Sequence, residues 1–350
     1  MREGETRRVQ ITGKSSYIVS IPKRWVEELG LKPRDEVMIV RHGISSIQIM
    51  PKRMLKQQQR DATIHVGSKS SADSVLRDVI SLYLLGYSVI NIRAEQGRLA
   101  SELKKVVKES ARRLLMGTEV TADSMDNITI QVLLNVMELS IDNAFKRMLL
   151  LTKSMLKESL VALKESNTEL AREVIAGDDE VDRFSFYIVR QLNIAVENEY
   201  LLADMGLSKL SHCLDYRLIV KSVERIADHA TGIAQQVLDN GERIDEDTMN
   251  RIIGVSSEII NVLDESCLAL FKMDASEAKD AITKAKSIIE REKTLMDGFR
   301  YSSDRASYKV RFIVENVKRI AEYVSDIGEL VLNMTIEQIL RGILQSQSMV

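Results

Sequence analysis

The fold is decided by the stretch Lys221-Ser-Val-Glu-Arg-Ile-Ala-Asp-His-Ala-Thr-Gly-Ile-Ala234, which returns in weaker form as Glu315-Asn-Val-Lys-Arg-Ile-Ala-Glu-Tyr-Val-Ser-Asp-Ile-Gly328. Both copies contain Arg-Ile-Ala, at residues 225–227 and 319–321. Two copies this far apart indicate a duplicated group of helices, because a solenoid repeat would return at a shorter period.

Apolar residues around the first copy recur at intervals of three and four, as they do on one face of a helix. The pattern covers Ile219, Val223, Ile226, Ala230, Ile233 and Val237, and an earlier segment shows it at Ile141, Phe145, Met148, Thr152 and Met155. Turn-forming residues interrupt it near 165–167, 203–206, 240–241, 273–275 and 302–304. We therefore expect six helices in two tandem three-helix bundles, at residues 129–240 and 245–345.

Composition indicates a soluble, multidomain chain. The 350 residues are 45% hydrophobic, which is enough for large cores. No run reaches the roughly 18 apolar residues of a membrane helix, and the first residues lack the apolar segment of a signal peptide. We expect a cytoplasmic protein without membrane insertion. Cys213 and Cys267, the only cysteines, suggest neither a disulfide framework nor a thiolate zinc site.

Charge and proline divide the chain at the same place. Residues 1–60 hold 13 Lys and Arg against 6 Asp and Glu, a balance of +7, although the whole chain has a net charge of −2. All three prolines lie at or before Pro51. A small basic head is thus followed by an acidic, proline-free body, in which long helices are expected.

The head, residues 1–55, alternates short strands and turns. Strand patterns near residues 8–12, 17–21, 36–40 and 46–50 surround a short helical segment at residues 23–29. So small a piece buries little surface alone, which predicts a homodimer. The run from Arg8 through Gly13-Lys14-Ser-Ser-Tyr17 to Ile21-Pro22-Lys23, with Leu31-Lys-Pro-Arg-Asp-Glu-Val37, resembles the AbrB/SpoVT family of swapped-hairpin DNA-binding domains. The resemblance implies a swapped-hairpin β-barrel.

Basic side chains in the hairpin and turn segments are the candidate DNA contacts, because phosphates are bound by Lys and Arg and pairing doubles the footprint. They are Arg7, Arg8, Lys14, Lys23 and Arg24. The alternative is that these charges only keep a small domain soluble. Charge together with the family pattern favours DNA binding.

Residues 60–126 predict a small α/β module of βαβαβ order. Strand patterns begin near Ala62, Tyr87 and Thr118, and amphipathic helices are expected at residues 72–85 and 99–115. The segment has neither GxGxxG nor a P-loop, so it shows none of the usual nucleotide-binding signals. The fold class is therefore multidomain α+β: a β-barrel head, an α/β module and two helical bundles.

Two pairs of acids mark the first bundle. Asp178 and Asp182 lie one turn apart on one expected helix, as do Glu224 and Asp228 on the next, so each pair shares a face. Together the pairs would repel each other unless a cation neutralised them. Oxygen ligands suit Mg²⁺ or Ca²⁺, and also iron in carboxylate-bridged bundles. The alternative is an ordinary solvated surface of ion pairs, in which Asp179 pairs with Arg183 and Lys221 pairs with Glu224.

The two acidic segments, Gly177-Asp-Asp-Glu-Val-Asp-Arg-Phe184 and Glu224-Arg-Ile-Ala-Asp-His-Ala-Thr-Gly-Ile-Ala234, resemble the E(D)xxxD motifs of PhoU-type phosphate-uptake regulators. That family implies two three-helix bundles with multinuclear metal clusters. The resemblance raises Asp178, Asp182, Glu224 and Asp228 to candidate metal ligands. The second copy departs from the motif, because Lys318 replaces the acid and can pair with Glu322. We expect one cluster per chain.

The combined resemblances imply a phosphate-responsive regulator of phosphate uptake, in the style of archaeal proteins that join an AbrB-like head to a PhoU-like body. DNA, inorganic phosphate and a phosphate transporter or signalling protein are the expected partners. No nucleophile–base arrangement points to an enzyme. Two alternatives stay open: an adaptor that contacts a transporter or kinase without binding DNA, and a metal-dependent hydrolase.

Overall fold

The computed structural model describes residues 4–13, 15–42, 46–51, 60–134, 139–203, 205–239, 244–299 and 305–347. Its chain divides into two compact units, residues 1–59 and 60–350. The candidate DNA contact Lys14 lies outside the described residues.

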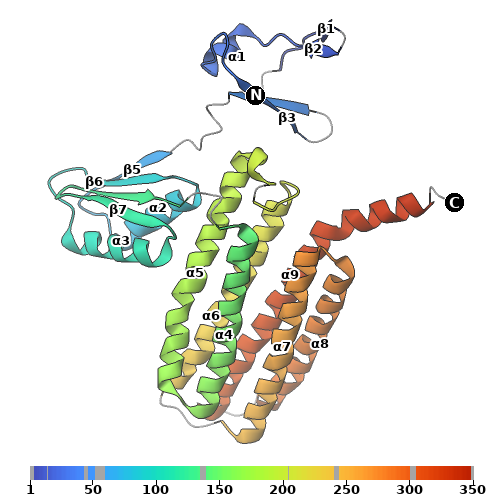
Figure 1. Ribbon diagram of the computed structural model, residues 1–350. Helices are drawn as coiled ribbons and strands as arrows, with labels where there is room; N and C mark the ends of the chain where they lie inside the picture. Colours follow the sequence, from blue (N-terminus) through green and yellow to red (C-terminus); the bar gives the residue numbers. More distant parts are fainter. Residues whose placement is uncertain are drawn as a thin grey trace. The chain divides into compact units, whose positions relative to one another are not determined.

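The head unit consists of two antiparallel hairpins and one short helix (Figure 1). Strands β1 (Gln10–Thr12) and β2 (Ser16–Ile18) form the first hairpin, and β3 (Val37–His42) and β4 (Ser46–Pro51) form the second. Helix α1 (Lys23–Glu28) lies between the hairpins in the chain and ends before Gly30, whose φ of +59° suits glycine. Among the described residues, the hairpins remain separate two-stranded sheets in one chain. The expected closed barrel needs strands from a second copy and stays a prediction.

The second unit begins with a four-stranded sheet of order β5-β6-β8-β7. Its elements are β5 (Asp61–Val66), α2 (Ala72–Leu84), β6 (Val89–Ala94), α3 (Ser101–Leu114), β7 (Thr118–Asp123) and β8 (Asn127–Val132). Strands β5 and β6 are parallel, whereas β8 pairs antiparallel with both β6 and β7. The βαβαβ order expected for this module was wrong, because it lacks the fourth strand, β8. This strand follows β7 after a short turn, and its alternating Asn-Ile-Thr-Ile-Gln-Val lies where the sequence predicts the start of the first bundle.

Fully buried isoleucines on β6 and β8 face α2 and α3, which pack against each other. They are Ile90, Ile92, Ile128 and Ile130. Both helices also contact α5 of the helical body. The α/β module is therefore packed onto that helix and is not merely tethered to it.

Six long helices make up the described part of the body, as expected. They are α4 (Ile141–Glu165), α5 (Thr168–Glu197), α6 (His212–Leu238), α7 (Glu246–Lys272), α8 (Ala275–Phe299) and α9 (Arg305–Gln347), and a short 3₁₀ turn, η2 (Glu199–Leu201), follows α5. Helices α4–α6 and α7–α9 form two neighbouring groups of three (Figure 1). None of the helices in the described ranges combines the length and apolar content needed to cross a bilayer.

The two bundles repeat the same local chemistry at their first turns. Ser166 and Met273 each end a helix with φ of +54°. The next residue in each case caps the following helix: the side chain of Asn167 accepts backbone N–H bonds at the start of α5, and that of Asp274 does so at the start of α8. This shared turn supports the duplication inferred from the sequence repeat.

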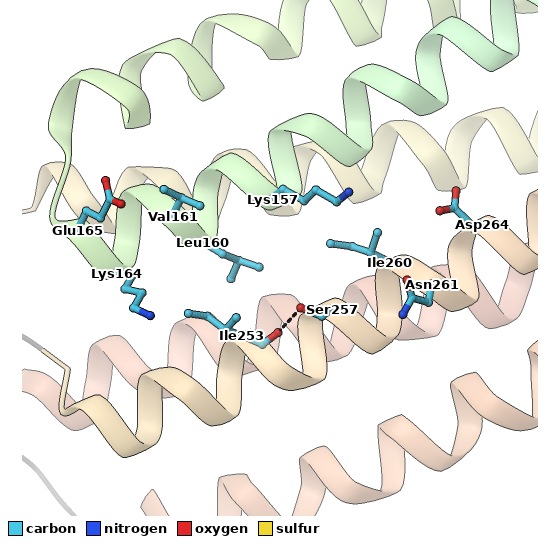
Figure 2. A pocket seen from close by; sticks show the side chains of 10 residues that line it. All are labelled: Lys157, Leu160, Val161, Lys164, Glu165, Ile253, Ser257, Ile260, Asn261 and Asp264. Atoms are coloured by element: carbon cyan, nitrogen blue, oxygen red, sulfur yellow. Dashed lines mark hydrogen bonds between the residues drawn. The ribbon is translucent and has the colours of Figure 1, made fainter.

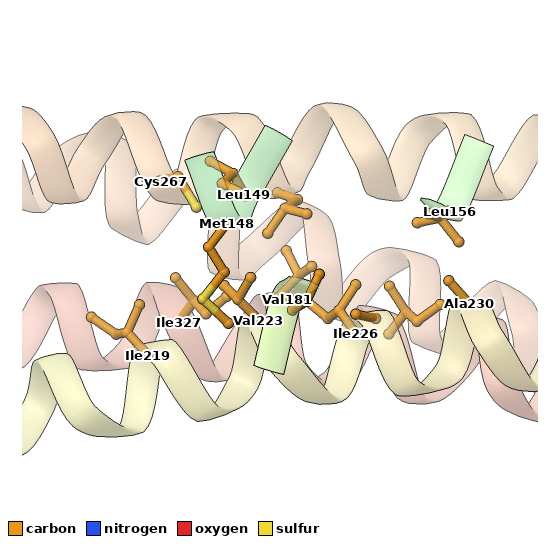
Figure 3. Packing of buried hydrophobic residues seen from close by; sticks show 14 of the residues in the cluster. Met148, Leu149, Leu156, Val181, Ile219, Val223, Ile226, Ala230, Cys267 and Ile327 are labelled. Atoms are coloured by element: carbon orange, nitrogen blue, oxygen red, sulfur yellow. The ribbon is translucent and has the colours of Figure 1, made fainter. Parts of the chain in front are cut away.

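The repeated sequence itself forms the seam between the bundles. The side chains of His229 on α6 and Asn316 on α9 are hydrogen-bonded at 2.7 Å, and the guanidinium carbon of Arg225 lies 5.5 Å from the ring centre of Tyr323. Higher residue numbers on α6 face lower numbers on α9, so the two helices run in opposite directions. One continuous core results, to which Val223 and Ile226 of α6, Met148 of α4 and Ile327 of α9 all contribute (Figure 3).

Candidate functional site

Four carboxylates gather where α5 and α6 pack side by side. Asp178 and Asp182 come from α5, and Glu224 and Asp228 come from α6. The buried residues Val181 and Val223 place these acids at the edge of the apolar core, because each lies next in sequence to an acid of the pair. The structure thus brings together all four candidate metal ligands.

The acids influence one another's ionisation. Burial raises the pKa of Asp182 to about 7, and the carboxylates of Glu224, Asp178 and Asp228 add to this effect. Burial likewise raises the pKa of Asp178 to about 6, with Asp228 as its strongest acidic neighbour. Without added positive charge, the site therefore holds protons near neutral pH.

Lys221 supplies part of that positive charge. Its ammonium donates to Glu224 Oε1 at 2.5 Å, as the sequence suggested. Burial still raises the pKa of Glu224, although Lys221 lowers it. One internal cation therefore does not balance the cluster.

Two buried oxygen atoms at the site have no conventional hydrogen bond. They are Glu224 Oε2, which forms an ion pair with the Lys221 ammonium, and the hydroxyl oxygen of Thr231, which lies one turn beyond Asp228 and close enough to Asp178 to lower the pKa of that acid. Thr231 is 8% exposed and could have been found by its helical spacing from Asp228. Buried oxygen atoms with incomplete hydrogen bonding are stabilised further by a bound cation or an ordered water.

The chemistry of these donors fits a hard divalent cation, but their present positions do not complete a coordination shell. Within the described ranges, no three side chains of His, Cys, Asp or Glu converge closely enough to hold one ion. Carboxylates on flexible side chains can reorient, and oxygen donors suit Mg²⁺, Ca²⁺ and iron. Asp228, which is exposed, is the acid with most freedom to move.

The second copy lacks this arrangement. Lys318 lies 3.7 Å from both Glu315 and Glu322, and Arg319 bonds Glu322 at 2.8 Å. The pairing expected between Lys318 and Glu322 is therefore confirmed. His229 packs on Tyr323 with ring centres 5.7 Å apart and bonds Asn316, so its side chain serves packing between the bundles.

The α/β module contacts the helix that carries two of the acids. Arg113 on α3 forms an ion pair with Asp179, 3.2 Å away and next to Asp178. The pair expected between Asp179 and Arg183 was wrong, because Arg113 approaches Asp179 from the module and Arg183 lies 3.4 Å from Glu180. Further along α5, the buried guanidinium of Arg190 donates to the carbonyls of Tyr83, Tyr87 and Gly86 at the end of α2. The sequence offered no signal for these contacts, because they join residues from 66 to 107 positions apart.

The candidate DNA contacts lie on the head and are separate in sequence from this cluster. Arg7 pairs with Glu5, Lys23 lies 3.6 Å from Glu27, and Arg24 bonds Glu28 at 2.8 Å. These pairs are exposed, so they cost little to exchange for a phosphate contact. Arg8 has no ion-pair partner among the described residues of the head.

The fold and site define a class: a duplicated helical body with one acidic cluster, preceded by a basic hairpin head. Comparisons with known families agree. Residues 145–237, which contain all four acids, match the PhoU domain, and residues 10–57 match the MazE domain of bacterial antitoxins, described as antidote-toxin recognition. Part of the helical body thus matches the PhoU domain, and the head matches an AbrB/MazE-like domain.

Individual relatives cover about half of this chain. A phosphate-specific transport system accessory protein, a PhoU homologue of Borreliella burgdorferi, is 26% identical over 185 residues, which are 49% of this chain and 81% of the relative. Crystal structures of PhoU from Streptococcus pneumoniae and Pseudomonas aeruginosa align with TM-scores of 0.46 and 0.45, at 19% and 15% identity. Each alignment covers 55% of this chain, and 91% and 93% of the respective PhoU chain.

Proposed function

We propose that the protein is a phosphate-responsive regulator of phosphate uptake that binds DNA through its head and senses or signals through a metal-binding helical body. The observation that carries this proposal is the cluster of four carboxylates on α5 and α6, inside the segment that matches the PhoU domain. The relative named as an accessory protein of phosphate-specific transport supports the same process. In this role the protein acts in regulation and does not catalyse a reaction.

A divalent cation at the cluster would be held by Asp178, Asp182, Glu224 and Asp228. Iron, magnesium or another divalent ion fits these oxygen donors. Bound there, the ion would neutralise part of the charge of the acids and would supply a Lewis-acidic centre for an oxygen of inorganic phosphate. The protein itself holds the four acids close together. The electrostatic repulsion between them destabilises the metal-free fold, and a bound cation would relieve it.

Metal binding is tested by titrating chelator-treated protein with Mn²⁺, Mg²⁺ and Fe²⁺ under anaerobic conditions and measuring bound metal and melting temperature. We expect binding and stabilisation in the native protein and loss of both in the Asp182→Asn, Glu224→Gln double variant. Glu173→Gln, which removes an exposed acid on the same helix, is the matched control. Equal metal content in the native protein and the double variant would refute the metal site.

DNA binding by the head requires that its basic side chains lie on one surface, which a twofold pair of heads would extend. The exposed apolar side chains of the hairpins support such pairing. They include Val9, Ile11, Tyr17, Ile39 and Ile47, each more than 60% exposed in the single chain. Contact between two heads would remove this surface from water.

The corresponding experiment measures binding of full-length protein to genomic DNA fragments over a salt series, with and without phosphate. Two altered proteins test whether the head binds DNA: a chain that lacks residues 1–59, and the variant Arg8→Gln. The variant Lys32→Gln, which also removes one positive charge from the head, is the control. Saturable, sequence-selective binding that requires the head would support transcriptional control. A change in affinity with phosphate would connect the head to the body.

An adaptor role without DNA is the second candidate function, in which the protein contacts a phosphate transporter or kinase. The observation that favours it is that glutamates of the head lie beside three candidate DNA contacts, Arg7, Lys23 and Arg24, and offset their charge, even though each exposed pair could exchange for a phosphate. Only weak, salt-sensitive DNA association in the same experiment would select this role and leave the head as a dimerisation device.

A further inference from the structure

A groove runs between α4 of the first bundle and α7 of the second, on a part of the body separate from the acidic cluster. Its volume is about 430 Å³, within the range that small organic ligands occupy. Leu160 and Ile260 form an apolar floor, each only 5% exposed, and Val161 stands on the rim with 43% of its surface exposed (Figure 2).

Two lysines on α4 line this groove. Lys157 and Lys164 lie seven residues apart, about 10 Å along the helix axis. Neither forms an ion pair with any residue that the structure describes. The neighbouring Lys153, in contrast, is bonded to Asp264 at 2.5 Å, so the acid at that end of the groove is already neutralised.

Of the four charged side chains that line the groove, the two acids are paired or turned away, and the two lysines remain available to a ligand. Figure 2 shows the Lys164 side chain pointing toward α7 and the Glu165 carboxylate pointing away from it. Ser257 donates its hydroxyl to the carbonyl of Ile253 at 2.8 Å, which leaves its oxygen as an acceptor, and Asn261 offers both a donor and an acceptor.

We propose that this groove binds an amphipathic organic anion, a small molecule of about nucleotide size with an apolar or aromatic body and an anionic group. The body would lie on Leu160 and Ile260, where it displaces water from an apolar floor. The anionic group would lie between the ammonium groups of Lys157 and Lys164, which have flexible stems that can converge on it.

Other occupants fit the groove less well. A metal cation would meet two unpaired lysines, and inorganic phosphate would leave the apolar floor in water. Because α4 and α7 belong to different bundles, the proposed ligand contacts both and favours their present packing. The proposal concerns a second site and does not depend on DNA or metal binding.

The probe for this site is 8-anilinonaphthalene-1-sulfonate, which joins an aromatic body to one anionic group. We expect saturable binding to the full chain and a rise in Kd of at least tenfold in two variants: Val161→Trp, which fills the groove and keeps its charge, and the Lys157→Gln, Lys164→Gln double variant. Lys279→Gln, an exposed lysine on α8, is the control and should leave Kd unchanged. The uncharged analogue N-phenyl-1-naphthylamine should lose affinity to Val161→Trp but not to the double lysine variant.

Competition identifies the natural class. Displacement of the probe by AMP or ATP would assign the site to nucleotides, and displacement by decanoate would assign it to acyl carboxylates. The exposed apolar side chains of the head can also bind the probe. Binding to the groove is therefore measured as the part of the probe binding that Val161→Trp abolishes. Unchanged probe binding in both groove variants, with melting curves that show folded protein, would overturn the proposal.

Discussion

Asp182 shows how a single side chain makes the stability of the metal-free protein depend on pH. Its pKa is about 7 in the folded chain, whereas an unperturbed aspartate has a pKa of about 4. The folded state therefore binds more protons than the unfolded state between these values. Linkage then requires that this group's contribution to stability, present at low pH, is lost as pH rises through about 7.

We accordingly expect Asp182→Asn to stabilise chelator-treated protein at pH 8 by about 1–2 kcal/mol, since the side chain is partly solvated and the full shift does not apply. At pH 5 the carboxyl is already protonated, so the substitution should have little effect. Urea unfolding at both pH values measures the difference, with Glu173→Gln as control. A destabilised variant at pH 8 would show that the cluster does not repel itself in the absence of metal.

Ser166 shows a second effect at the residue scale, namely steric strain. Its backbone adopts the left-handed conformation, which is unfavourable for a residue with a Cβ atom. Glycine adopts φ of +54° without steric cost, and helices commonly end on it. We expect Ser166→Gly to change stability by about +0.5 kcal/mol, the gain being reduced by the greater freedom of glycine in the unfolded chain. Lys164→Gly, two residues earlier within α4, should instead destabilise by about 1 kcal/mol, and thermal unfolding distinguishes the two signs.

At the scale of elements, Arg190 holds the end of α2 against α5. Its guanidinium donates to three carbonyls, including those of Tyr87 at 2.8 Å and Gly86 at 3.2 Å, and its carbon lies 4.9 Å from the ring centre of Tyr83. Asn193 adds a bond to the carbonyl of Leu84 at 2.8 Å. Burial lowers the pKa of Arg190, so the carbonyls and the ring are its main compensation for leaving water.

Replacing Arg190 by Met should keep the packing volume but leave these carbonyls without donors. We expect a loss of about 2–4 kcal/mol in unfolding free energy. Hydrogen exchange should also accelerate at the backbone amides of residues 85–87, which close α2. Arg172→Met, an exposed arginine on the same helix, is the control. Unchanged exchange in the Arg190 variant would mean that α2 is held to α5 by apolar packing alone.

Elements with strong periodicity could be predicted from the sequence, whereas contacts between distant elements could not. The spacing from Ile219 to Val237 fixed the helix and its buried face, and the acid pairs of the site followed from the same period. Strand β8 was missed because six alternating residues give a weak signal beside long helices. Arg113 and Arg190 look like surface charges in the sequence, and only the packing of α3 and α2 on α5 reveals their partners.

For the whole molecule, the exposed apolar surface of the head is the feature that a single chain leaves unexplained. Residues 60–350 have their own hydrophobic cores, one in the α/β module and one in the helical body, so this unit should fold when residues 1–59 are removed. If pairing of heads covers Ile39, Ile47 and their neighbours, the full chain should be a dimer and the shortened chain a monomer in light scattering. Ile39→Lys or Ile47→Lys should then dissociate the full chain, because each places a charge in a desolvated contact, whereas Lys32→Glu should not. A dimer that survives removal of the head would place the dimer contact in residues 60–350 instead. The proposal that two paired heads form the DNA-binding surface would then lose its support.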